Sequence, residues 1–141
     1  MILKNICLWL FLTGGVAFGQ NLTVTFTNIR NSNGVFRVGF FTNQETYDSG
    51  DPAFYKTVLK TGMQNNSVTV TFQDIPEGIY GIVVLDDENQ NDKTDFGIFL
   101  PIEGFGFSNY TVSLLCVPKF SDFDFVYQKP HTQITIQLKY L

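Results

Sequence analysis

Apolar and polar side chains alternate along most of this chain, which is the pattern of β-strands with one buried face. In residues 22–27, Leu22, Val24 and Phe26 alternate with threonines. The same period of two recurs in residues 35–41, 67–72, 123–128 and 132–140. Since no segment carries a sustained helical period and turn signals separate these short runs, the pattern predicts a β-sandwich.

The second of these runs has one face that is clearly better suited to the core. Phe36, Val38 and Phe40 share it, and residues 31–34, Asn-Ser-Asn-Gly, come before it. An Asn-Gly step is a strong hairpin signal, so we expect a hairpin turn at this point.

Residues 42–60 are less regular. The Asp, Ser, Gly and Pro residues of 48–52 break any regular element. After this break we expect a weak turn of helix at residues 53–56 and a short edge strand at residues 57–60.

A Pro-x-Gly turn at Pro76 and Gly78 leads directly into a strand that carries Tyr80. We expect a corner in which the Tyr80 hydroxyl bonds to the turn backbone, with an exposed strand tyrosine as the alternative. Residues 79–85 are apolar on both faces, which predicts a central strand.

The N-terminal residues have the features of a secretory signal peptide. Lys4 precedes an apolar stretch at residues 6–12, and Ala-Phe-Gly at 17–19 fits a small-x-small cleavage site. We therefore expect a signal peptide at residues 1–19 and one domain over residues 20–141. The alternative is an uncleaved anchor, but the stretch is short for a membrane span, so we expect no stable membrane insertion after cleavage.

Composition narrows the classes of partner and reaction. The net charge is −4 and basic residues do not cluster, which argues against nucleic acid as a partner. With a single histidine, His131, the chain has no Ser-His-Asp or Cys-His set, so we name no catalytic residue. Cleavage removes Cys7, and we expect Cys116 to be a buried thiol rather than a reactive one.

The strongest chemical signal is an acidic loop after the central strand. Five of the thirteen acidic residues fall in residues 86–95. Asp and Asn residues occupy positions 1, 3, 5 and 9 of this loop, the spacing with which calcium loops place oxygen ligands. Oxygen ligands without His or Cys favour Ca²⁺ over zinc or copper. The ligands that we predict are Asp87, Asn89, Asn91, Lys93 through its backbone carbonyl, and Asp95.

Other features of the loop favour a turn without metal. Position 12 is Ile98 rather than glutamate, and Glu103 would replace it only if the following loop folds back. Position 6 is Asp92 rather than glycine. Asp and Asn also favour turns because their side chains bond to the nearby backbone, so an Asx-rich turn remains the alternative.

Adjacent carboxylates raise a second alternative, a hydrolase that acts on glycans through an acid and a base. Asp86, Asp87 and Glu88 are consecutive, however, and side chains at the end of a strand diverge.

Residues 96–110 combine glycines with Phe96, Phe99, Phe105 and Phe107. Long loops in small domains are often functional. These rings either cap an open end of the sandwich or present aromatic surface to a glycan, a peptide or an envelope protein.

Two blocks of the sequence resemble a known family: PEGIYGIVVLDDENQN at residues 76–91 and PIEGFGFSN at residues 101–109. The family is domain of unknown function 2141, small exported bacterial proteins, and the resemblance extends over residues 22–141. It implies an all-β, Ig-like or transthyretin-like antiparallel β-sandwich without established activity, and the alternating runs described above predict about seven strands. Asp86 stands where the family usually has histidine, and Asp92 stands where it usually has glycine.

From these observations we expect a secreted or periplasmic protein of the bacterial cell envelope. It would be a non-catalytic binding or accessory module with a Ca²⁺ loop, and its partner would be an envelope protein or a glycan. The carboxylate-dependent hydrolase remains the alternative.

Overall fold

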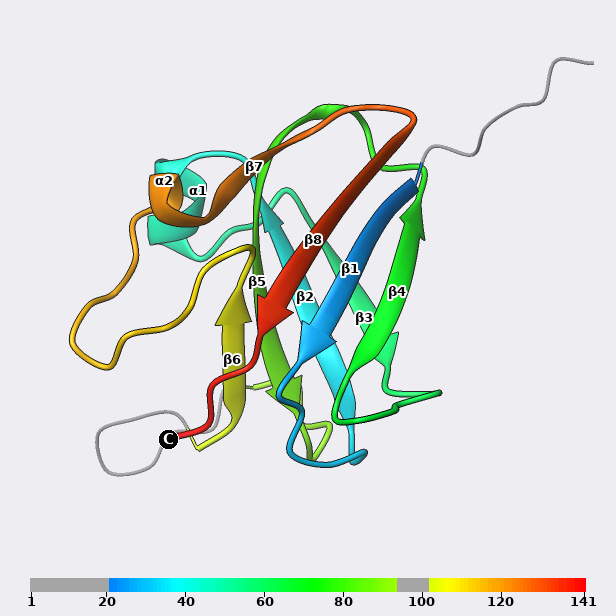
Figure 1. Ribbon diagram of the computed structural model, residues 1–141. Helices are drawn as coiled ribbons and strands as arrows, with labels where there is room; N and C mark the ends of the chain where they lie inside the picture. The colour runs from blue at the N-terminus through cyan, green and yellow to red at the C-terminus, as the bar shows by residue number, and fades with distance from the viewer. Residues whose placement is uncertain (1–20, 94–101) are drawn as a thin grey trace, which may run out of the picture.

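The computed structural model describes residues 21–93 and 102–141, and in these residues two β-sheets pack face to face (Figure 1). One sheet has three strands in the order β4-β1-β8, and the other has the order β3-β2-β5-β6, with β7 paired to β5. The strands are β1 (Asn21–Thr27), β2 (Val35–Phe41), β3 (Phe54–Leu59), β4 (Val68–Gln73), β5 (Gly78–Asp87), β6 (Gly104–Phe107), β7 (Asp124–Tyr127) and β8 (His131–Gln137). The predicted all-β sandwich is confirmed, with eight strands among the described residues rather than about seven.

Two details of the pairing differ from the sequence-based expectation. β1 and β8 pair in parallel, whereas every other pair of these strands is antiparallel. The hairpin expected at residues 31–34 is wrong, because β1 and β2 lie in different sheets. The turn crosses from one sheet to the other, and Gly34 has a φ of +69° there. A Cβ on Gly34 would lie 2.0 Å from the backbone oxygen of Asp87, so only glycine fits this close approach.

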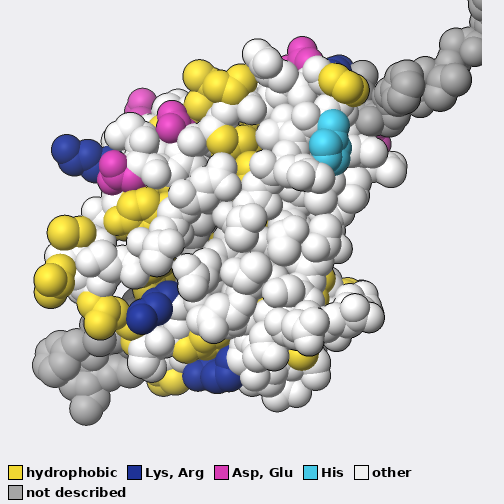
Figure 2. All heavy atoms as spheres, viewed as in Figure 1, with side chains coloured by type: hydrophobic (Ala, Val, Ile, Leu, Met, Phe, Trp, Pro, Cys, Tyr) yellow, Lys and Arg dark blue, Asp and Glu magenta, His cyan; other side chains and the backbone are white. Residues whose placement is uncertain are grey.

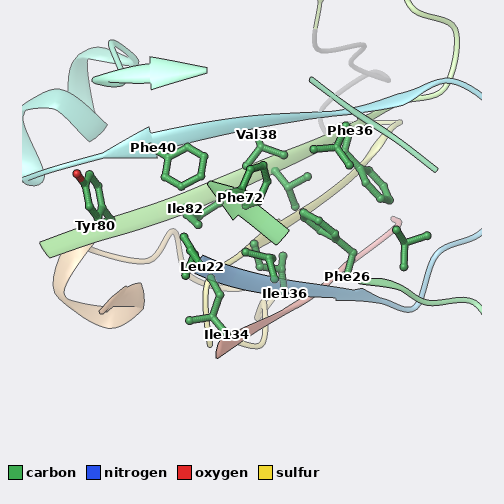
Figure 3. Close-up of a cluster of buried hydrophobic side chains, with 14 of the residues drawn as sticks. Leu22, Phe26, Phe36, Val38, Phe40, Phe72, Tyr80, Ile82, Ile134 and Ile136 are labelled. Carbon is green, nitrogen blue, oxygen red and sulfur yellow. The ribbon is translucent and has the colours of Figure 1, made fainter. Parts of the chain in front are cut away.

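The main core lies between the two sheets and is rich in aromatic rings (Figure 3). The predicted inward residues Phe36, Val38 and Phe40 are all fully buried. Phe36 stacks on Phe26 of the opposite sheet with ring centroids 4.7 Å apart. Truncating one such buried phenylalanine to alanine typically costs about 3–5 kcal/mol, so these rings dominate the packing energy.

The corner at the start of β5 forms as expected. Tyr80 is 6 % exposed, and its hydroxyl donates a hydrogen bond of 2.8 Å to the backbone oxygen of Pro76. β5 continues for ten residues and pairs with β2, β6 and β7, which confirms the prediction of a central strand.

Two short helices, α1 (Gln44–Ser49) and α2 (Phe120–Phe123), lie side by side at one flank of the sandwich (Figure 1). The turn of helix expected at residues 53–56 is wrong, because β3 occupies that stretch. Local capping starts and ends α1: Asn43 accepts a 2.9 Å bond from the Thr46 amide, and Gly50 closes the helix with a φ of +67°. A second apolar cluster forms around the helices, with Phe41, Phe107, Phe120 and Phe123 buried in it.

The proposed signal peptide, residues 1–19, lies outside the described residues. In the part of the chain that is described, no helix has the length and hydrophobicity needed to span a membrane.

Candidate functional site

The acidic loop begins at Asp87, the last residue of β5. Its pairing with Val35 of β2 keeps the strand intact up to this point, and Asp87 is fully buried. One carboxylate oxygen accepts the Asn91 amide at 3.1 Å, and the other accepts the Asp92 amide at 3.2 Å. The Asp87 side chain therefore fixes the loop backbone through two of its amides.

The following Asn residues continue the same arrangement two residues at a time. The side-chain oxygen of Asn89 accepts the Asn91 amide at 3.2 Å, and that of Asn91 accepts the Lys93 amide at 2.9 Å. Asp92, at the position where calcium loops have glycine, has a φ of +60°. Asp thus makes the sharp turn here in the left-handed region, which Asn and Asp tolerate better than most residues.

Arg37 supplies the positive charge that faces this loop. It lies on β2 between Phe36 and Val38, so strand alternation turns it away from the core, onto the outer face of the five-stranded sheet. Its Nε donates to Asp87 Oδ2 at 3.0 Å, and its guanidinium also forms an ion pair with Asp92. Arg37 was not among the predicted site residues, although a charge within an otherwise apolar strand is a visible signal in the sequence.

A pocket opens beside Arg37 on the same outer face of the sheet, with a volume of about 450 Å³. Gly39 and Tyr55, which pair between β2 and β3, both line it, and Tyr55 is 65 % exposed. Its lining residues are Arg37, Gly39, Phe41, Tyr55, Lys56, Thr57, Val83, Leu85 and Asp92. Asp92 of the loop lines the pocket, and so does Arg37, which forms an ion pair with Asp92. The pocket and the loop therefore form one continuous site.

The two carboxylates at the end of β5 face opposite ways. Asp87 contacts Arg37 on the outer face, whereas Asp86 forms an ion pair with Lys60 and accepts a 2.6 Å bond from the Tyr140 hydroxyl. Burial raises the pKa of Asp86, although the bonds from Lys60 and Tyr140 oppose this shift. An acid and a base that share one cleft would require a different geometry.

Glu88 forms a bidentate pair with Arg30 at 3.0 and 2.9 Å on the surface of the same end of the sandwich. Burial alone would raise the pKa of Glu88, but the Arg30 bond and charge outweigh it and lower this pKa below its usual value. The same hydrogen bond raises the pKa of Arg30.

Four of the five predicted metal ligands, Asp87, Asn89, Asn91 and Lys93, lie together in the loop, and Asp95 falls outside the described residues. Within residues 21–93 and 102–141, no group of three or more His, Cys, Asp or Glu is placed to hold a metal ion. The other oxygen atoms that the loop offers near Asp87 belong to the side-chain amides of Asn89 and Asn91. Glu103 directly precedes Gly104, the β6 partner of Asp86, and is 4 % exposed, so it comes back to this end of the sheet.

The loop between β6 and α2 exposes aliphatic side chains, and hydrophobic groups stand out at this edge in Figure 2. Leu114, Leu115 and Val117 are 65 %, 91 % and 85 % exposed. The expectation of a buried Cys116 is wrong, since the apolar neighbours that were expected to cover it are themselves in solvent.

Of the four phenylalanines named in the glycine-rich segment, residues 96–110, two lie in the part of the chain that the structure describes. Phe107 is 7 % exposed, and Phe105 packs beside it with ring centroids 6.3 Å apart, so these two rings cover the sandwich as one interpretation expected. Phe96 and Phe99 lie outside the described residues.

The chain belongs to the family DUF2141, described as an uncharacterized protein conserved in bacteria, whose model matches residues 24–135. The resemblance noted in the sequence is thereby confirmed. Comparisons with curated proteins and with solved structures give no match.

Proposed function

We propose that this protein is an exported, non-catalytic binding module that takes a carbohydrate on the outer face of its five-stranded sheet, beside a loop that holds Ca²⁺. The observation that carries the proposal is the position of Arg37. Its side chain lines the pocket and also contacts Asp87 and Asp92 of the loop. A change in the loop therefore acts directly on the pocket.

The chemistry of the pocket favours a carbohydrate over a purely apolar ligand. Tyr55 offers an exposed aromatic face, against which the C–H face of a sugar ring can stack. Thr57, Arg37 and Asp92 supply hydrogen-bonding groups around it. A volume of about 450 Å³ and a lining of both apolar and polar residues are typical of small-ligand sites.

The donor set of the loop suits Ca²⁺, which prefers carboxylate and amide oxygens. Asp87, Asn89 and Asn91 supply such oxygens at alternate positions, and Glu103 is a further carboxylate at the same end of the sheet. In this proposal Arg37 competes with the metal ion, because its guanidinium donates a hydrogen bond to a carboxylate oxygen of Asp87 that would also bind the metal. Bound Ca²⁺ would fix the loop rather than take part in a reaction.

A non-catalytic role fits the carboxylates of this site. Asp86 is held by Lys60 and Tyr140, and Asp87 is held by Arg37 and two loop amides. Carboxylates with such contacts serve the structure and are poorly placed to exchange protons with a substrate.

A glycan array with the folded chain tests the carbohydrate proposal. Tyr55→Ala removes the aromatic face, whereas Leu59→Ala shortens another exposed side chain of β3 that does not line the pocket. We expect saturable binding to one class of glycan, lost in Tyr55→Ala, kept in Leu59→Ala and weakened by a Ca²⁺ chelator. An array without hits, or hits that survive in Tyr55→Ala, would contradict the carbohydrate site.

Export rests on the sequence of residues 1–19 and is tested separately. We expect N-terminal sequencing of the protein recovered from the periplasm or medium to begin at Gln20. Recovery of the uncleaved chain from the cytoplasm would contradict export.

A further inference from the structure

Lys60 and Asp86 form an ion pair inside the sandwich, away from the pocket and independent of the function proposed above. Lys60 directly follows β3, and Asp86 lies on the inner face of β5, with Phe36 of β2 paired opposite it. The two side chains are 1 % and 0 % exposed. The Lys60 amine also lies over the Phe36 ring, 5.2 Å from its centroid.

Burial disfavours two full charges at this place. Removing an ammonium and a carboxylate from water is costly, and their mutual attraction repays this cost only partly. The charged neighbours, Arg30 and Glu88, bond to each other on the surface. A lysine amine held against a carboxyl group in a buried site is the pair from which an amide can form.

The hydrogen bonds around the pair distinguish the two oxygens of Asp86. Oδ2 accepts a 2.6 Å bond from the Tyr140 hydroxyl, which in turn accepts the Arg30 amide at 3.1 Å. Apart from the Lys60 amine that it faces, Oδ1 has no hydrogen-bond partner among residues 21–93 and 102–141. The Lys60 amine also donates to the backbone oxygen of Asn31 at 3.3 Å.

We propose that Lys60 and Asp86 condense into an intramolecular amide that links the end of β3 to β5 across β2. The amine Nζ attacks the carboxyl carbon Cγ, the N–C bond forms, and the C–Oδ1 bond breaks. Oδ1 leaves as water with two protons that both come from the Lys60 ammonium: one passes to Oδ1 within the ion pair and frees the amine, and the second leaves Nζ after the attack. No oxidant, reductant or other reactant is needed. Tyr140 is a positioning residue, because its hydroxyl holds Oδ2 and polarises the carboxyl group under attack.

The contacts already present fit the product. Within the described residues, the oxygen that leaves has no hydrogen-bonding neighbour other than the attacking amine. The oxygen that remains, Oδ2, keeps the Tyr140 hydroxyl as its donor, and the single N–H of the amide keeps the Asn31 oxygen as its acceptor. A buried amide with both its donor and its acceptor satisfied carries little desolvation penalty.

In water, an amine and a carboxyl group do not condense to an amide to a useful extent. Here the two groups are held together in a buried site, and both conditions favour the amide. Groups held in reacting geometry reach effective concentrations of about 10⁵–10⁸ M. The site is buried, so the water that would reverse the reaction has poor access to the bond.

Mass spectrometry of the folded full chain, after denaturation, tests the bond. We expect an intact mass lower than the sequence mass by one water molecule, and a branched peptide that joins Lys60 to Asp86 after proteolysis. The branched peptide excludes a succinimide, which also loses one water. Lys60→Arg keeps a positive charge but cannot form this bond, and we expect it to show the full sequence mass.

Tyr140→Phe tests the positioning role. It keeps the ring and removes the hydroxyl that holds Oδ2, so we expect the linked fraction to form more slowly or to fall after the same incubation. If folded wild-type protein keeps its full mass after prolonged incubation, and Lys60 and Asp86 are recovered on separate peptides, the proposal is wrong. The wild-type result stands even if a variant fails to fold.

Discussion

The guanidinium of Arg37 lies 3.0 Å from a carboxylate oxygen of Asp87, although the two residues are 50 positions apart in the chain. This contact joins the middle of β2 to the first residue of the acidic loop. The same arginine lines the pocket on the outer face of the sheet. A loop that looked like a separate motif in the sequence is therefore one wall of a larger site.

Arg37→Gln tests the competition between the arginine and Ca²⁺. Without Ca²⁺ we expect a loss of about 1–3 kcal/mol in unfolding free energy, because buried Asp87 loses a charged hydrogen-bond partner. With Ca²⁺ we expect tighter metal binding than in wild type, by about tenfold or more, because a nearby positive charge is gone. Calorimetric titration and urea unfolding measure the two effects.

Arg30→Gln is the matched control for this variant. Arg30 pairs with Glu88, which is not one of the predicted metal ligands, and it is more exposed than Arg37. We expect a small loss of stability and an unchanged Ca²⁺ affinity. Equal affinities in wild type and Arg37→Gln would argue against a shared oxygen at Asp87.

Gly34→Ala tests the close approach of the crossing turn to β5. The new Cβ would meet the backbone of Asp87 and Glu88, and alanine would also be strained at a φ of +69°. Gly62 has a similar φ of +72° but open space around it, so Gly62→Ala carries the strain alone, about 1–2 kcal/mol. We expect Gly34→Ala to lose clearly more stability in urea unfolding. Equal losses would show that the turn can move away from β5.

Tyr80→Phe tests the corner at the start of β5. It keeps the ring and removes the hydroxyl that bonds to Pro76, so we expect a loss of about 1 kcal/mol. Tyr127→Phe is the control, because the buried Tyr127 hydroxyl has no partner in the described part of the chain. We expect Tyr127→Phe to be neutral or stabilising in the same unfolding experiment. The opposite order of the two variants would contradict the corner.

Glu88→Gln tests the pH dependence of the surface pair. Since Arg30 lowers the pKa of Glu88 in the folded state, the pair stabilises the protein above the usual glutamate pKa, and this contribution is lost as the pH falls. The pair is partly exposed, so we expect a difference from wild type of up to about 1 kcal/mol at neutral pH. Unfolding at neutral and acidic pH should show this difference shrinking in acid, and a constant difference would contradict the ion pair.

The sequence predicted those parts of the fold that alternation and local turn chemistry determine. The inward face of β2 and the Tyr80 corner depend on residues close together in the chain, and both were predicted correctly. The strands that pair with β2 are determined by the sheet to which each strand belongs. The Asn-Gly step at residues 33–34 indicates a turn but not whether the chain stays in one sheet after it. Helix α1 was missed because caps at Asn43 and Gly50, rather than an apolar period, define its six residues.

The candidate site shows the same division. The spacing of Asp87, Asn89 and Asn91 made the loop visible in the sequence. Arg37 and Tyr55 reach the site through strand pairing, Arg37 opposite both Thr57 and Leu85, and Tyr55 opposite Gly39, so only the sheet register brings them together. Cys116 is exposed although its neighbours in sequence are apolar, because Leu114, Leu115 and Val117 are themselves in solvent and form no core around it.

The most direct measurement of the proposed site is a calorimetric titration of Ca²⁺ into chelator-treated protein, compared with Asn91→Ala. Asn91 is exposed, so this variant removes an oxygen donor without disturbing the core. We expect wild type to bind one Ca²⁺ per chain and to melt at a higher temperature once it is bound, and both effects to weaken strongly in Asn91→Ala. If millimolar Ca²⁺ gives no binding heat and no shift in melting temperature, the loop is an Asx-rich turn held by its own side chains and by Arg37.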